Sequence, residues 1–112
     1  MIEKTLLDYL STKLNPVPCF MEIPANRPTS FVLLERTGRS ISNHLPESTF
    51  TIKCFADSLY NAAVLSDELE QALFDFIESD EIRNIVINSS YDYSDVDRKE
   101  YIYQTVVEIY HY

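Results

Sequence analysis

Few residues in this chain are of types that catalyse reactions or bind metals, and their spacing fits none of the common patterns. The histidines are His44, in a polar segment, and His111, next to the last residue. Nucleophilic catalysis needs a Ser, Cys or Thr within hydrogen-bond reach of a base, and neither a Gly-x-Ser-x-Gly nor a Cys–His signature occurs. The pattern indicates a protein that is not an enzyme. Carboxylates paired from distant strands, which spacing does not reveal, keep an enzyme as an open alternative.

Metal and cofactor sites are equally unsupported by the sequence. Cys19 and Cys54 each lie in an apolar, strand-like run without a neighbouring ligand, so we expect buried, reduced thiols. Asp92, Asp95 and Asp97 are close together, but their spacing and the missing glycine do not match a calcium-binding loop. The chain has one glycine, which argues against a glycine-rich phosphate loop. We expect no metal and no cofactor.

The net charge argues against two classes of partner, nucleic acids and anionic membranes. Eighteen acidic residues against nine basic ones give a net charge of −9, which disfavours binding to nucleic-acid backbones and to anionic membranes. Many of the acids crowd residues 67–81, where a solvated helix face is the plain interpretation. No apolar run approaches the ~20 residues that span a bilayer. The N-terminus does not read as a secretory signal, so we expect an intracellular protein.

Apolar periodicity predicts the elements. A period near 3.6 indicates helices over 2–14 and 59–77, the second capped by Asp57-Ser58, and alternation or apolar runs indicate strands. We expect strands over 19–23, 31–36, 48–56, 82–88 and 101–111. Gly38 is expected to close the second of these at a turn, residues 39–47 to be a mobile connection or long hairpin loop, and residues 89–100 a polar loop.

These elements predict a single domain over residues 1–112 of the α+β class. The expected order is αβββαββ, with an antiparallel or mixed sheet of four to five strands and both helices packed on one face. The opposite face is half apolar, since Phe55 breaks the polar side of its strand and the chain holds eight tyrosines. We expect that face or its edge to meet another element or another protein.

Several short segments, in order along nearly the whole chain, resemble a known family. They are Pro24 and Pro28, the run Phe31-Val-Leu-Leu-Glu-Arg-Thr-Gly38, the alternation Thr51-Ile-Lys-Cys-Phe-Ala56, Asn61-Ala-Ala63 in the long helix, and Tyr91-Asp-Tyr93 before the last strand. In these the chain resembles the tail terminator and head-tail joining proteins of tailed bacteriophages, often labelled minor capsid or tail-completion proteins. It differs in having Arg39 where relatives often have a second glycine.

The resemblance implies a structural role in the virion. Such a subunit assembles as a homo-oligomeric ring, typically a hexamer, on the head-proximal end of the tail tube, stops tube growth and meets the head connector. It would be made in the cytoplasm of the bacterial host, without membrane contact. DNA would pass through an acidic lumen without specific binding.

A ring subunit needs two unlike patches that meet head to tail. We expect Arg27 and Arg39 to be cationic contacts to a neighbour's acidic helix, and Phe55, Tyr91 and Tyr93 to be apolar anchors, because Tyr and Arg are enriched at interface centres. The alternative from another class is a small acidic inhibitor or adaptor that binds a basic partner. The sequence does not separate a terminator from neighbouring head-completion proteins.

Overall fold

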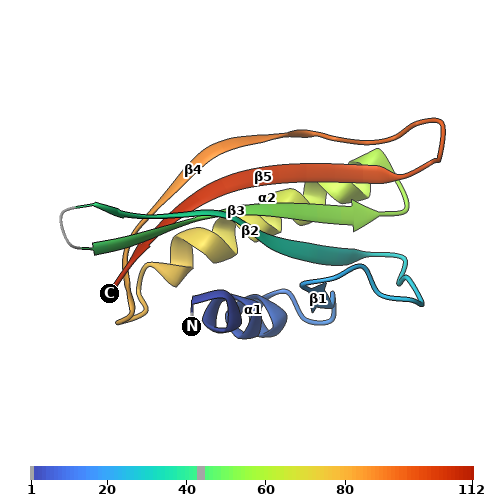
Figure 1. Ribbon diagram of the computed structural model, residues 1–112. Helices are drawn as coiled ribbons and strands as arrows, with labels where there is room; N and C mark the ends of the chain where they lie inside the picture. Colours follow the sequence, from blue (N-terminus) through green and yellow to red (C-terminus); the bar gives the residue numbers. More distant parts are fainter. Residues whose placement is uncertain (1, 43–44) are drawn as a thin grey trace.

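The chain folds into two helices and five strands (Figure 1). The computed structural model describes residues 2–42 and 45–112. In chain order the elements are α1 (Ile2–Lys13), β1 (Cys19–Phe20), β2 (Phe31–Ser42), β3 (Leu45–Ala56), α2 (Leu59–Phe76), β4 (Ile82–Asp92) and β5 (Tyr101–His111). This is the predicted order.

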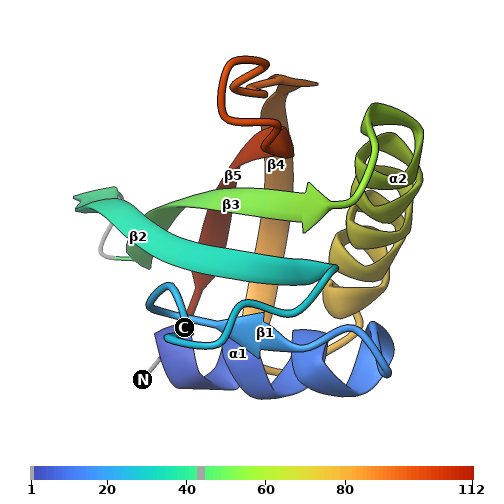
Figure 2. The same cartoon turned by 90° about the vertical axis from the view of Figure 1, so that its right-hand side faces the viewer.

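The strands form one mixed sheet in the order β1-β2-β3-β5-β4. β1 runs parallel to β2, and the other three pairings are antiparallel. The strands twist strongly from β2 to β4, and the two helices enclose the core together with the sheet (Figure 2). The prediction of an α+β fold with both helices on one face is confirmed.

The core lies between the helices and one face of the sheet, as the apolar periods of the sequence require. Leu6 and Leu10 of α1 and Leu69 of α2 are fully buried there, against Phe50 and Ile52 of β3. α2 begins where predicted, because the Ser58 hydroxyl accepts a hydrogen bond of 3.1 Å from the backbone N–H of Asn61 and so satisfies one of the free donors of the first turn.

The prediction that β2 ends at Gly38 was wrong. β2 continues to Ser42, and β3 begins at Leu45 rather than at residue 48. A bulge between Arg36 and Gly38 shifts the register, and pairing then resumes as far as Ser42 and Leu45. Gly38 has no positive φ and does not form a turn. Most of the expected connection is therefore a two-stranded ribbon; its remaining part, residues 43–44 with the histidine considered above, lies outside the described residues.

β4 is also longer than predicted, ending at Asp92 instead of at residue 88. Its apolar alternation stops at Ile87, where a bulge precedes Ser89. Beyond it Ser90 faces the helices, and its hydroxyl lies 3.1 Å from that of Ser66 and 3.3 Å from that of Thr105. The strand is continued by hydroxyl contacts at one end of the core, which an apolar pattern does not reveal.

Two phenylalanines of different burial test this arrangement. We expect Phe50→Ala to lower the free energy of unfolding by about 3–5 kcal/mol, because the ring is fully buried and its removal leaves a cavity. Phe74→Ala, at a side chain that is 54% exposed on α2, is the matched control and should cost about 0.5 kcal/mol. Urea unfolding of the monomer measures both. Equal losses would contradict the packing described here.

Candidate functional site

Four of the five residues singled out from the sequence lie on the face of the sheet opposite the helices, called the outer face below. One end of this face is apolar and is buried by the chain itself. Its cluster consists of Phe31, Leu33, Phe55 and Ile102, each at most 6% exposed, with Phe20 packed against them. The rings of Phe31 and Phe55 stack at a centroid distance of 4.4 Å and an interplanar angle of 8°. These side chains behave as a second, smaller core.

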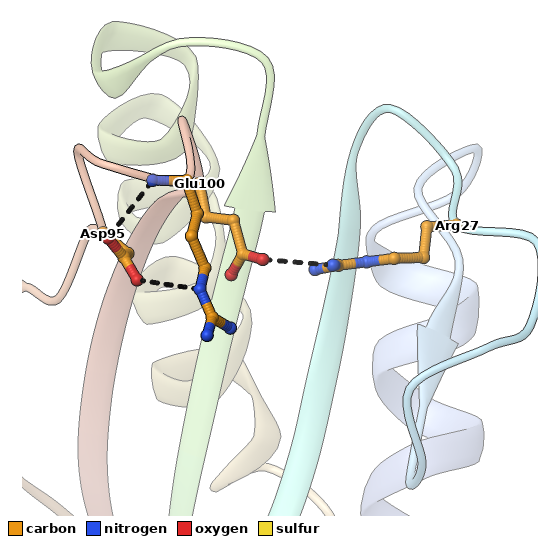
Figure 3. A network of polar contacts seen from close by, with 4 residues as sticks. Arg27, Asp95 and Glu100 are labelled. Atoms are coloured by element: carbon orange, nitrogen blue, oxygen red, sulfur yellow. Dashed lines mark hydrogen bonds and ion pairs between the residues drawn. The ribbon is translucent and has the colours of Figure 1, made fainter.

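Arg27 covers this cluster. Its guanidinium lies 5.5 Å from the ring centre of Phe31 and 5.2 Å from that of Phe55. Its Nη1 atom also donates to the Glu100 carboxylate at 3.3 Å. Figure 3 shows the side chain reaching from the segment before β2 to the residue before β5, beside the Asp95–Arg98 pair of the adjoining loop. Arg27 thus ties two distant segments together over an apolar surface.

The structure therefore brings Arg27 and Phe55 together, but within one chain. Phe55 packs against its own neighbours and, at 6% exposure, offers little surface to another molecule. Arg27 retains 39% of its side-chain exposure, so its outer edge remains accessible.

Tyr91 and Tyr93 continue the outer face beyond the buried cluster, and both are exposed, at 42% and 51%. Their rings meet edge to face at 6.4 Å. The Lys53 ammonium lies 5.2 Å from the centre of the Tyr93 ring, and the Gln104 amide donates to the Tyr91 hydroxyl. Sequence reasoning missed Lys53 and Gln104. The signal was available, since strand alternation places Lys53 on the same side as Phe55.

Lys99 belongs to the same region. With Arg27, Phe31, Phe55 and Glu100 it lines a small hollow of about 200 Å³ at the end of the outer face. It is the one non-glycine residue with positive φ, at 55°, among the residues that the structure describes. We call Arg27, Lys53, Tyr91, Tyr93 and Lys99 together the cationic tyrosine patch.

Arg39 lies elsewhere. It pairs with Ser48 in the β2–β3 ribbon and lines a hollow of about 360 Å³ with Glu3 and Arg36, on the helix side of the sheet. There Arg36 donates to the Glu3 carboxylate at 3.0 Å. The five residues singled out from the sequence therefore divide into four on the outer face and one behind it.

The solvent side of α2 forms a second surface of distinct character. None of its 18 residues is Lys or Arg. Its exposed side combines acidic residues with large apolar ones, among them Tyr60 at 76% and Phe74 at 54% exposure. We call the following set the acidic helix surface: Tyr60, Val64, Asp67, Glu68, Gln71, Phe74 and Asp75.

Neither thiol is poised for chemistry at neutral pH. Both are free, and burial raises the pKa of the Cys19 thiol to about 11 and raises the pKa of the Cys54 thiol further. A thiol with a raised pKa carries almost no thiolate at pH 7. Within residues 2–42 and 45–112, no three His, Cys, Asp or Glu side chains gather closely enough to hold a metal ion. In the same part of the chain no helix is long and apolar enough to cross a membrane.

The sequence matches no model of a known protein family, and a search of curated proteins found no significant match.

Removing the Arg27 side chain tests whether it seals the outer cluster. We expect Arg27→Ala to lower the free energy of unfolding by about 1 kcal/mol, since it loses two ring contacts and an ion pair that is partly exposed. Arg98→Ala removes an arginine that is 78% exposed and paired at 3.7 Å, and should change stability by less than about 0.5 kcal/mol. Chemical denaturation compares them; an equal effect of both would show that Arg27 does not seal the cluster.

Alkylation by iodoacetamide reports the state of the thiols. Because burial raises the pKa of Cys19 to about 11, its labelling rate should increase with pH up to that value, about tenfold per unit, whereas an unfolded thiol levels off near pH 8.5. Cys54, which is fully buried, should stay unlabelled in folded Cys19→Ser protein. Fast labelling of Cys19 at pH 7 would contradict this environment.

Proposed function

We propose that this chain is a ring-forming structural subunit of the bacteriophage tail-completion type, which caps the head-proximal end of the tail tube and joins it to the head connector. The observation that carries the proposal is the presence of two unlike exposed surfaces on opposite sides of one small chain. The sequence resemblance to that family supplies the particular assembly.

The two surfaces suit a ring. A rotationally closed ring uses two different patches on each subunit, so that each copy presents one to its left neighbour and the other to its right. The outer face exposes Tyr91, Tyr93 and Val86, while α2 exposes Tyr60 and Phe74 on the other side. Large exposed apolar and aromatic side chains of this kind are typical of surfaces that become buried on assembly.

The shape of the chain is compatible with the role. The chain is elongated, with extents of 45 × 24 × 24 Å, and the far end of the β2–β3 ribbon projects beyond α1 (Figure 1). An extended ribbon of this kind can reach across a subunit boundary or onto the tube. The ribbon carries Arg39, which has no ion-pair partner among the residues that the structure describes.

The charge of the chain fits a ring around DNA. At a net charge of −9, an assembled ring presents an acidic surface that repels the phosphate backbone. DNA would then slide through the lumen without specific contacts. The protein would belong to the virion and, before assembly, to the cytoplasm of the bacterial host.

Mass photometry and negative-stain microscopy of the protein, alone and co-expressed with the tail tube protein, test the proposal. We expect a closed homo-oligomer, of about six copies, either free or on tube ends. Tyr91→Ser combined with Tyr93→Ser should weaken assembly at least about tenfold, since aromatic anchors dominate such interfaces. The matched control is Tyr112→Ser, at a tyrosine that is 72% exposed and remote from the patch; it should assemble normally.

Two outcomes would contradict the proposal. One is a protein that stays monomeric both alone and beside tail tubes. The other is a stoichiometric complex with a single basic protein and no self-association, which would support the inhibitor or adaptor instead. Circular dichroism of the double variant confirms that any loss of assembly is not loss of fold.

A further inference from the structure

We infer that the Arg39 side chain folds onto the free carboxylate oxygen of Glu3, so that two arginines of β2 hold one carboxylate of α1 between them. The contact is a clasp between the base of the β2–β3 ribbon and the first turn of α1. It lies within one chain and depends neither on the proposed ring nor on any partner.

The two arginines lie on the same side of the ribbon because of the bulge in β2. In an uninterrupted strand, residues three positions apart point to opposite faces. The bulge between Arg36 and Gly38 shifts the pairing, so that Arg36 lies opposite Phe50 and Arg39 lies opposite Ser48. Phe50 is buried in the core on the helix side, and Ser48, two positions before it on β3, shares its face. Both arginines therefore lie on the helix side.

Glu3 is a buried carboxylate of which one oxygen is in use. The residue is 8% exposed, and its Oε2 atom accepts from the Arg36 guanidinium at 3.0 Å. Its Oε1 atom is buried and has no hydrogen-bond partner in the part of the chain that the structure describes. A buried carboxylate oxygen without a donor is costly, and one carboxylate can accept from two guanidiniums. The site lacks one donor.

Arg39 is the free cation of the same site. Glu3, Arg36 and Arg39 line one hollow of about 360 Å³, which gives the Arg39 side chain space to turn toward Glu3. Arg39 makes no ion pair within the described residues. His111 also lines the hollow, but its Nε2 atom is already engaged at 3.1 Å from the Ser48 hydroxyl. The five N–H donors of a guanidinium and its flexible stem suit Arg39 to reach Oε1 by side-chain rotation alone.

Two further acids compete for Arg39. Asp80 and Glu81 are exposed and line a neighbouring hollow of about 450 Å³, which Arg39 does not line. The positive and negative charges of this region nearly balance, so net charge does not select the contact. Burial does, because an exposed carboxylate is hydrated and gains little from an ion pair, whereas the buried oxygen of Glu3 has no donor.

NMR of the Arg39 guanidinium tests the clasp. At least one of its N–H signals should exchange with water at least about tenfold more slowly than those of free arginine at the same pH, because a hydrogen bond to a carboxylate protects it. Glu3→Met removes both oxygens and should abolish the slowing. The matched control is Glu35→Met, which removes an exposed carboxylate on the opposite face of β2 and should leave it unchanged. Asp80→Asn combined with Glu81→Gln should also leave it unchanged.

Amide hydrogen exchange of the ribbon tests whether the clasp holds its base. Arg39→Met should accelerate exchange of the paired amides in residues 37–40 and 46–48 at least about threefold, since local opening becomes easier. In the Glu3→Met chain the same substitution should have no further effect, because the two side chains act together.

Three results would overturn the inference. The first is a native Arg39 whose N–H groups all exchange as fast as those of free arginine, and it requires no variant, so it decides the matter even if Glu3→Met does not fold. The second is slowing that persists in Glu3→Met, or that is lost in the variant of Asp80 and Glu81. The third is slowing that increases with protein concentration, which would assign Arg39 to a neighbouring copy. Absence of rings alters none of these measurements.

Discussion

A sheet that packs helices on one face must leave its other face in water or cover it in some other way. In this protein both helices lie on the same side, and the strands are too few to close on themselves. The outer face therefore determines the surface properties of the whole chain. Its apolar end is covered by the Arg27 guanidinium and by the short segment that carries Arg27, rather than by a helix.

The burial of side chains changes along the outer face. Near Phe31 and Phe55 the side chains are buried, next to them the tyrosines are half exposed, and farther along Thr49 and Thr51 are half-buried polar residues. A cation placed over a ring keeps part of its hydration while shielding apolar area beneath it. The boundary between sealed and open surface consequently falls at Arg27 and Lys53, where charge and aromatic area coincide.

Much of the fold was predictable because it follows from local rules. The period of α2, its Ser58 cap and the alternation around Ile52 depend only on nearby residues, and these elements lie where expected. The β2–β3 ribbon was missed because its pairing rests on backbone hydrogen bonds that need no apolar pattern, and the bulge at Gly38 resembles a turn in sequence. The end of β4 was missed for a related reason, as hydroxyl contacts replace apolar packing there.

The candidate site was harder to predict, because its members meet only through tertiary contacts. Arg27 and Glu100 are separated by 73 positions, and no spacing rule connects them. Tyr91 and Tyr93 could be singled out by residue type. The place of Lys53 in the site follows from its contact with the Tyr93 ring, which is a tertiary contact.

A chain with a charge of −9 repels its own copies at long range, so any self-association has to be driven by short-range contacts. Exposed ion pairs contribute little to affinity, typically about 0–1 kcal/mol each, and the aromatic area must provide most of it. Long-range repulsion therefore opposes association of free copies, and burial of the exposed aromatic side chains at short range is the contribution that acts against it.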